Sequence, residues 1–333
     1  MSAIRSLFFI IMVILAAGCA GTSRPVIVSA SDGLQINDFS ADVTDVFSSE
    51  LVRLNVEVEN VGGTTAQNVN AVLFGSIKSW TAVTPSGMQS VAPAMTPPLQ
   101  GSGSPGDMSK RIWTMTAPYL PQGLSQDYPV GVRVGYDYTT TSITSFDVVS
   151  YDQFDLLRKK GEFVQVDTKS KNSNAPVKIE LAGSSPMRPR VRCVEASAED
   201  CISETMTLTL ANVGSGVPFR KGTDLGNPVS EDIGVVLIGI RTSSGKLECD
   251  TGVKPDSASD TVKIVSSGLD AQPDKKDLRL ARGFGSVRIP CSFTMKAGEI
   301  TSGVPKDTVT AEIVADYSYA IDGILNIKVT SNE

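Results

Sequence analysis

Histidine is absent from this 333-residue chain. A Ser-His-Asp or Cys-His catalytic arrangement needs an imidazole as its general base, so both are excluded. Aromatic residues make up 6% of the sequence and charged residues 20%, and the formal net charge is −6. Neither half of the chain is basic, so the charge distribution gives no support for a nucleic-acid partner.

The chain also lacks a continuous apolar run of the about 20 residues that a membrane-spanning helix needs. The apolar run near its start, Leu7 to Leu15, follows Arg5 and ends in Ala16-Ala17-Gly18-Cys19. This order is typical of a secretory signal peptide, and an uncleaved membrane anchor is the alternative. The sequence therefore predicts export, with residues 1–18 removed as the signal peptide.

The residues around Cys19 resemble the lipobox of bacterial and archaeal lipoproteins. In that family small residues directly precede a cysteine that is lipidated and becomes the new N-terminus. The match departs in one respect, because Leu15 stands four residues before Cys19 and the family usually has leucine three before. The resemblance implies a lipid at Cys19, a tether over residues 19–27, and a protein held by membrane lipid on the extracytoplasmic face.

Cysteine is scarce, with five in the chain and no CxxC pair among them. If Cys19 carries lipid, four remain, and this even number predicts two disulfides in an exported domain. Four cysteines allow three connectivities, of which we favour Cys193 with Cys201 and Cys249 with Cys291. A zinc site is the competing interpretation, but the absence of histidine and of CxxC pairs disfavours it.

One stretch of the sequence, Leu51 to Gly75, is repeated further along as Met206 to Gly239. Each copy begins with apolar residues at every second position, which is the pattern of a strand with one buried face. Each copy then has the same turn, Asn60-Val61-Gly62 in the first and Asn212-Val213-Gly214 in the second. We interpret each copy as a hairpin and the two copies as two β domains.

Two further pairs of segments recur in the same order, shifted by 180 and 181 residues. Trp113 and Met115 correspond to Phe293 and Met295, and the segment Val130 to Tyr138 corresponds to Ala311 to Tyr319. Two tyrosines end each of the latter segments with same-face spacing, so we expect them in the core rather than in an aromatic binding stripe. These residues are Tyr136, Tyr138, Tyr317 and Tyr319.

Three segments rich in glycine and proline are expected to be loops: Thr84 to Asp107, Gly216 to Pro228 and Asp250 to Asp260. Between the repeats, Ser150 and Gln153 have the spacing of a capping box, and Gly161 can end a helix. We therefore expect a short helix over Tyr151 to Lys160. Its basic trio, Arg158-Lys159-Lys160, suits the negative end of the helix dipole, and a membrane-surface role is the less favoured alternative.

About seven short strands per repeat predict an all-β protein. The expected architecture is two tandem immunoglobulin-like β-sandwich domains, residues 28–150 and 163–333, joined by a linker helix over residues 151–162. The second domain would hold both disulfides.

The strand that ends in Asn60-Val61-Gly62, the following Ala66-Gln67-Asn68-Val69 and the late Tyr136-Asp137-Tyr138 carry a family resemblance. They are similar to the adhesion-related immunoglobulin-like modules of archaeal and bacterial surface proteins, which are often described as S-layer-like. The resemblance covers about 120 residues of the first repeat and less of the second. It implies a surface location and structural or binding work rather than chemistry.

Candidate reactive groups have weak support from spacing. Ser243 and Lys246 have the spacing of a Ser-Lys nucleophile but occupy a predicted turn, and no carboxylate lies in an aromatic-rich segment of the kind that favours glycoside hydrolysis. Two aspartate clusters could bind calcium, although neither has the spacing of a known oxygen cage. These clusters are Asp38, Asp42 and Asp45, and Asp250, Asp256 and Asp260.

Taken together, these patterns predict no catalytic, cofactor-binding or metal-binding residue. The expected function is that of a non-catalytic cell-envelope lipoprotein, a structural or protein-binding scaffold with an envelope protein as partner. The alternative is a solute- or polymer-binding lipoprotein that delivers a ligand to a membrane partner.

Overall fold

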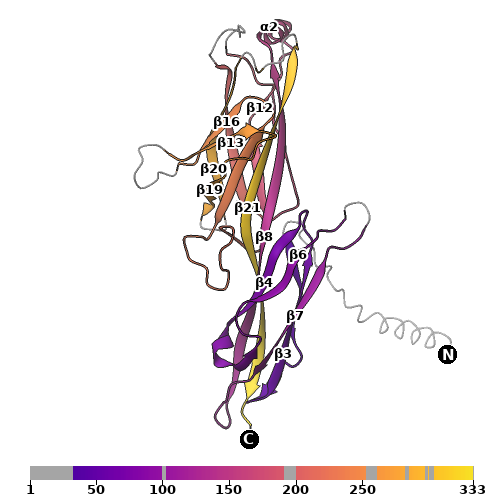
Figure 1. The fold of residues 1–333 in the computed structure, drawn as a ribbon, viewed down its shortest axis with the longest axis vertical. Coiled ribbons are helices and arrows are strands. Elements are labelled where there is room, and N and C mark those ends of the chain that lie inside the picture. The colour runs from indigo at the N-terminus through magenta and orange to yellow at the C-terminus, as the bar shows by residue number, and fades with distance from the viewer. Residues whose placement is uncertain are drawn as a thin grey trace, which may run out of the picture.

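The computed structural model describes residues 33–99, 103–190, 200–252, 261–281, 285–296, 299 and 304–332. The predictions for Cys19, Cys193 and the signal peptide lie outside these residues. The described chain is elongated and consists of two β-sandwich units stacked end to end (Figure 1). The all-β sandwich fold expected from the sequence is confirmed. We call the unit that carries the C-terminus the lower unit, and the unit at the opposite end the upper unit.

Each unit has one small sheet of its own. The lower sheet has the order β1-β3-β7-β5 and consists of β1 (Leu34–Ala41), β3 (Leu51–Asn60), β7 (Met108–Thr116) and β5 (Thr81–Thr84). The upper sheet has the order β11-β13-β20-β16-β17 and consists of β11 (Val177–Ala182), β13 (Asp200–Asn212), β20 (Ser286–Lys296), β16 (Lys246–Asp250) and β17 (Lys263–Val265).

A third, ten-stranded sheet runs through both units and backs both small sheets. Its main path is β18 (Ser267–Gly268), β15 (Val235–Thr242), β21 (Lys306–Thr330), β8 (Ser125–Val149), β4 (Ala66–Gly75) and β6 (Gln89–Met95). Four short strands join it at the sides: β2 (Asp45–Phe47), β10 (Ser170–Asn172), β14 (Val217–Phe219) and β19 (Lys276–Arg279). The remaining elements are the pair β9 (Val166–Asp167) and β12 (Ser184–Ser185), the 3₁₀ turn η2 (Ser76–Ser79) and the helix α2 (Tyr151–Lys160).

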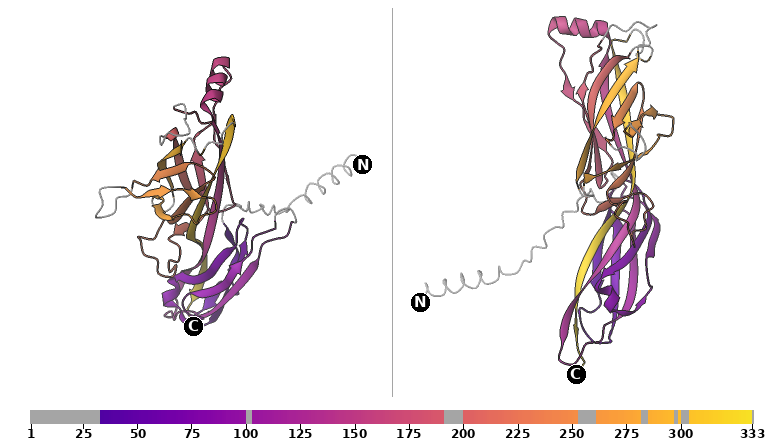
Figure 2. Two further views of the ribbon diagram at one scale, coloured as in Figure 1. Left: turned by 45° about the horizontal axis from the view of Figure 1, so that its top comes forward. Right: turned by 90° about the vertical axis from the view of Figure 1, so that its left-hand side faces the viewer.

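The two central strands, β8 and β21, hold the units together. They are antiparallel partners over 25 residues each, from the pair Ser125 and Thr330 to the pair Val149 and Lys306. Both can be followed through the whole length of the molecule in Figures 1 and 2. At about 3.3 Å per residue, each strand is about 80 Å long. The buried apolar side chains of the two units also form one continuous cluster, so the junction is part of the core.

The strand pairing shows that the upper unit is inserted into the lower one. The lower unit uses the first half of β8 and the last half of β21, while the upper unit uses the residues between them. The two strands pass from one unit to the other where Tyr138 and Tyr317 face each other. This differs from the expected division into residues 28–150 and 163–333, because the last strand of the chain returns to complete the first unit.

The expected helix is present, but it does not lie between the units. α2 begins after Ser150, whose side chain accepts a hydrogen bond from the Gln153 N–H, and ends at Gly161 in the left-handed conformation. It stands at the far end of the upper unit (Figures 1 and 2). The connection between the units runs instead through β8 and β21.

Three local expectations are corrected. The repeated stretch is not a hairpin, because β3 pairs with β1 and β7 while β4 lies in the other sheet and pairs with β6 and β8. The segment Thr84 to Asp107, expected as a loop, contains the strand β6. Finally, the sequence predicts two separate strands over Val130 to Tyr138 and Ile143 to Val149, but both are parts of the single strand β8. The residues between them are threonines and serine, which suit a strand and do not break it.

Candidate functional site at the junction of the two units

Four buried tyrosines mark the junction, two on β8 and two on β21. Tyr138 faces Tyr317 and Tyr136 faces Tyr319 across the strand pair. Each is at most 2% exposed. Neighbouring rings lie 5.7 to 6.4 Å apart between centroids in tilted or edge-to-face contacts, the arrangement that aromatic quadrupoles favour. The expectation that these residues belong to the core is confirmed.

The tyrosine hydroxyls form hydrogen bonds with the backbone of the turns beside them. The Tyr138 hydroxyl accepts hydrogen bonds from the backbone N–H groups of Gly63 and Thr64, each at 3.1 Å. The Tyr319 hydroxyl makes the equivalent contact in the repeat, accepting from the Gly216 N–H at 3.0 Å. Burial raises the pKa of the Tyr136 hydroxyl well above its usual range, so this group stays neutral.

The two recurring asparagines brace the same turns. Asn60 Oδ1 accepts from the Gly62 N–H at 3.0 Å, and its Nδ2 donates to the Thr64 carbonyl at 3.0 Å. Asn212 makes the same pair of bonds with Gly214 and Gly216. From sequence alone, asparagine at these positions indicates only a residue that tolerates turn geometry. The side chains also satisfy the polar backbone groups of the turn, which explains why asparagine stands at both positions.

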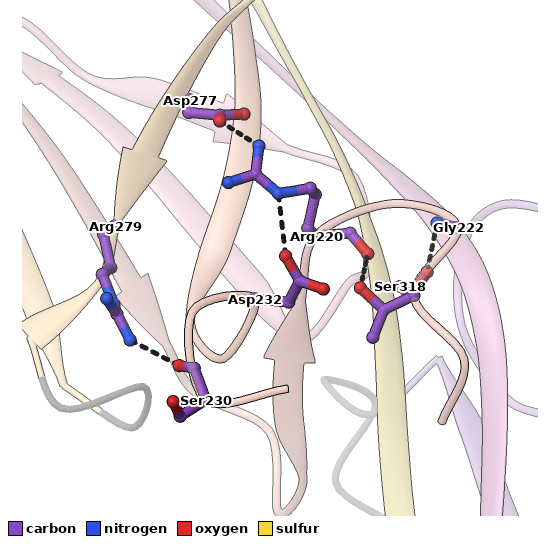
Figure 3. A network of polar contacts seen from close by, with 8 residues as sticks. Arg220, Gly222, Ser230, Asp232, Asp277, Arg279 and Ser318 are labelled. Atoms are coloured by element: carbon purple, nitrogen blue, oxygen red, sulfur yellow. Dashed lines mark hydrogen bonds and ion pairs between the residues drawn. The ribbon is translucent and has the colours of Figure 1, made fainter. Parts of the chain in front are cut away.

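A long connection of the upper unit crosses the junction. We call residues 216–234, between β13 and β15, the strap. Arg220 braces it from within, because its guanidinium pairs with Asp232 at 3.0 Å and with Asp277 of β19 (Figure 3). Ser318 of β21 also holds the strap, since its hydroxyl accepts from the Gly222 N–H at 3.0 Å (Figure 3).

The strap is not the purely polar excursion that its composition predicts. It contains the strand β14, and Phe219 and Leu225 are buried with Ala320 in a small apolar cluster. Leu225 lies directly over Gly135 of β8, where any Cβ would collide with the leucine side chain. With a Cβ at position 135, the Leu225 side chain would have to move aside for the strap to dock as it does here.

A cavity of about 320 Å³ lies beside the docked strap. Its floor is the outer face of β4 and β8, where β4 is irregular and Asn68 has a positive φ of 52°. Asp137 on this floor accepts hydrogen bonds from Asn68 Nδ2 at 2.8 Å and from the Ser318 hydroxyl at 2.5 Å. The remaining polar lining includes Asn70, Arg133, Thr223 and Asp224, and the aromatic in the lining is the buried Tyr136.

Asp316 anchors a second polar cluster at the junction. This carboxylate is 8% exposed, accepts from the Thr139 hydroxyl at 2.7 Å, and is paired with Lys275 and, at 4.0 Å, with Lys221 of the strap. Burial by itself would raise its pKa, but the Lys275 hydrogen bond, the Thr139 hydrogen bond and the two lysine charges outweigh burial and lower it.

We expect Asp316→Asn to lower the free energy of unfolding by about 2 kcal/mol at neutral pH, the size of a hydrogen bond to a charged group. Because the folded-state pKa of Asp316 is lowered, its contribution is present above the unfolded pKa of about 4 and is lost as pH falls through the folded value. The difference between wild type and variant should therefore shrink below about pH 4. Urea unfolding over a pH series measures it.

The matched control is Asp224→Asn, an exposed carboxylate of the strap that accepts a hydrogen bond from the Gly226 N–H at 3.0 Å and has no ion pair among the described residues. It should change the free energy of unfolding by less than about 0.5 kcal/mol, as substitutions at exposed positions usually do. A constant difference between wild type and Asp316→Asn from pH 7 to pH 3 would contradict the assignment.

The other residues singled out from the sequence are not assembled into a reactive site. The Ser243 hydroxyl accepts from the Thr310 N–H at 2.9 Å, and Lys246 is paired with Glu248 at 2.8 Å, so they do not form a nucleophile and base. Asp38, Asp42 and Asp45 have separate partners, namely Asn55, the Arg53 N–H and Lys328. Within the described part of the chain, no three His, Cys, Asp or Glu side chains are grouped so as to hold a metal ion. Asp256 and Asp260 lie outside it.

The disulfide between Cys249 and Cys291 is present, as expected from the sequence. The two residues face each other on β16 and β20 with their Cα atoms 4.0 Å apart, and both are buried. Cys201 is also disulfide-bonded. Its expected partner, Cys193, lies outside the described residues, so that pairing stays a prediction.

Comparison with known proteins does not assign the chain to a family. No family model matches it, and no curated protein does. Among solved structures, the secreted serine protease VesC from Vibrio cholerae is 9% identical with a TM-score of 0.19, over 87% of this chain and 51% of that one. Red sea bream transglutaminase is 10% identical with a TM-score of 0.19, over 90% and 31%. Collagen adhesin from S. aureus is 10% identical with a TM-score of 0.12, over 91% and 93%.

The chain thus spans about half the length of the protease and about a third of the transglutaminase. TM-scores this low carry no argument about activity or partners. Of the helices among the described residues, none has the length and apolar character to cross a bilayer.

Proposed function

We propose that this protein is an exported, non-catalytic lipoprotein of the cell envelope that acts as a structural or protein-binding scaffold. The observation that carries the proposal is that the two units are joined rigidly. The strands β8 and β21 run through both units, and one continuous core fills the junction. Such a body holds its two ends at a fixed separation of about 80 Å. A scaffold that spaces or presents envelope components needs this property.

Attachment to the envelope is supported by the start of the sequence. The apolar run from Leu7 to Leu15 and the small residues before Cys19 fit a signal peptide followed by a lipidated cysteine. The disulfide between Cys249 and Cys291 fits the same compartment, because such bonds persist mainly in exported proteins. The similarity to adhesion-related surface modules, drawn from the Asn-Val-Gly turns and the paired tyrosines, agrees with this location.

A second function is favoured by the junction cavity. A cavity of about 320 Å³ with polar side chains on its floor could admit a small solute, as in a solute- or polymer-binding lipoprotein. The aromatic in its lining, Tyr136, is 1% exposed and offers no ring face for a sugar to stack on. We therefore prefer the scaffold and keep the solute carrier as the alternative.

Replacing Cys19 with Ser should move most of the protein from the membrane fraction to the soluble fraction or the medium. The physical reason is that acyl chains supply about 0.8 kcal/mol per buried CH₂, and two chains or more are needed for stable anchoring. Fractionation of the native host followed by immunoblotting measures the change, and the mass of the mature N-terminus reports the modification.

The matched control is Ser23→Ala, which alters the tether and leaves the cysteine in place. It should remain in the membrane fraction with the lipid attached. Membrane retention of Cys19→Ser equal to that of wild type would reject the lipid anchor.

A further inference from the structure

Part of the last strand has no neighbouring strand on one side. β8 pairs with β21 along its whole length. On the other side of β21, β14 pairs only as far as Ala320, and β2 begins opposite Lys328. We call the segment between these two pairings, Asp322 to Asn326, the open edge. It belongs to the lower unit and is bounded by the strap and by the chain that leads into β2.

The backbone of the open edge presents unused hydrogen-bonding groups. The Lys328 N–H donates to the Thr44 carbonyl at 2.8 Å, on the side away from β8. Because backbone polar groups alternate in direction along a strand, those of Asp322, Ile324 and Asn326 point to the same side as that of Lys328. Among the described residues, none of these three N–H groups has a hydrogen-bond partner. A row of this kind is a ready template for one more strand.

Apolar side chains beside the open edge are incompletely covered. Ile36 and Phe39 of β1 and Leu325 of β21 pack against the core but are only partly buried. A Cβ at Gly323 would meet the Ile36 Cδ1 and the Phe39 Cβ at 3.5 Å, so β1 lies close to this part of β21. β1 nevertheless pairs with β3 in the other sheet. On the outer face, Ile324 is 69% exposed. An added strand would cover apolar surface on both of its faces.

The chain that leads into β1 has the composition to fill this place. Residues 26–31, Val-Ile-Val-Ser-Ala-Ser, carry no charge and begin with three β-branched residues, which favour strands. Pro25 stands directly before them, and proline is tolerated at the start of a strand. At the open edge, Asp322 is already paired with Arg133 at 2.8 Å, so an uncharged strand leaves no carboxylate there without a partner.

The same chain also enters β1 within reach of the open edge. The Leu34 N–H donates to the Tyr136 hydroxyl at 3.2 Å, and Tyr136 faces Tyr319 of β21. Tyr319 and Asp322 are about 10 Å apart along β21. Residues 29–32 can span about 13 Å when extended, so residues 26–28 reach the open edge if the chain turns back at Gly33. Gly33 has a φ of 67°, a conformation that glycine supplies in turns.

We propose that residues 26–30 dock on the open edge of their own chain as a short strand antiparallel to β21. The antiparallel direction follows because β21 runs away from the junction here, whereas the docked segment runs toward it. Val26 and Val28 then cover the partly buried side chains beside the open edge, and Ile27 lies next to Ile324. The same segment of a second copy competes poorly, since the chain's own segment is present at a far higher effective concentration.

Amide hydrogen exchange, resolved to single residues, tests the proposal on the chain from residue 19 onward with Cys19→Ser. The matched variants Val28→Asp and Ser23→Asp add the same charge inside and outside the docked segment. In Val28→Asp, the amides of Ile324 and Asn326 should exchange faster by on the order of ten-fold or more, because they lose their hydrogen bonds. Ser23→Asp should leave both rates unchanged. The Leu325 amide points toward β8 and should stay protected in every variant, which reports an intact fold.

Two further measurements separate docking from an indirect effect of the added charge. Ile27→Pro keeps an apolar side chain but removes a backbone donor, so it should also speed exchange at Ile324. A synthetic peptide of residues 24–31, added to the Val28→Asp variant, should restore slow exchange.

Equal exchange rates at Ile324 in the Cys19→Ser chain with and without Val28→Asp would overturn the proposal. Protection that increases with protein concentration, together with dimers in size-exclusion chromatography, would assign the open edge to a second copy and overturn it as well. The chain used carries no lipid, so neither result bears on the anchor, which fractionation of Cys19→Ser tests separately.

Discussion

Residues 33–150 expressed alone should not show a cooperative unfolding transition, although they contain every strand of the small lower sheet. The reason is that, without the end of β21, the lower unit lacks one of the two central strands of its sheet. That segment pairs with β8 and β2 and buries Ile321, Ile327 and Val329. At about 1.5 to 3 kcal/mol for each buried side chain, the loss is about 5 to 9 kcal/mol, as large as the whole stability of many domains.

The matched variant is a shortened chain in which residues 33–138 are joined to residues 317–332 through a two-residue Asn-Gly turn. Tyr138 and Tyr317 face each other in the native register, so a tight hairpin turn can replace the whole upper unit. This shortened chain should unfold cooperatively in urea and show a β-rich circular dichroism spectrum. A cooperative transition for residues 33–150 alone would show that β21 is dispensable for the lower unit.

Loss of the disulfide between Cys249 and Cys291 should be the largest effect of any paired substitution in the upper unit. The bond closes a loop with a sequence separation of 42 residues, for which the chain-entropy model gives about 4 kcal/mol. Both sulfurs lie in the core, so Cys249→Ala with Cys291→Ala also leaves apolar volume unfilled. Urea unfolding of the double variant under oxidising conditions measures the loss.

The control for this prediction comes from the first one. The shortened chain of residues 33–138 and 317–332 contains no cysteine, so a reducing agent should leave its unfolding midpoint unchanged while it lowers that of the full chain. A loss below about 1 kcal/mol in the double variant would mean that the unfolded chain is not appreciably restricted by this bond.

Local patterns predicted most of the strands and the helix, because each depends on residues close in sequence, and the favoured one of the three cysteine connectivities included the disulfide between Cys249 and Cys291. The alternation in β3 and the caps of α2 at Ser150 and Gly161 are of this kind. Local patterns could not predict that the two units share the strands β8 and β21. Nothing near Leu325 to Ile327 says that its partner is the segment from Tyr128 to Val130, far earlier in the chain, because pairing over that separation is fixed by the whole sheet.

The contacts at the junction of the two units could also not be predicted from local patterns. The recurrence of two tyrosines in each repeat predicted burial, yet it did not predict that the four rings meet where β8 and β21 pair at the junction of the two units. A spacing of 181 residues between equivalent tyrosines, combined with antiparallel pairing of the two segments, would have been the signal. The strap was missed for a different reason, because the isolated Phe219 and Leu225 in a Gly- and Pro-rich segment do not form a periodic pattern.

The insertion of one unit into the other also sets the order in which the chain can fold during synthesis. The lower unit starts first but must wait for the end of β21, including Ile327 and Val329, before its sheet is complete. Closing a chain segment of this length costs entropy and slows folding. If the upper unit folds first, it brings Thr139 and Asp316 side by side. The two distant segments of the lower unit then meet as though a short turn joined them.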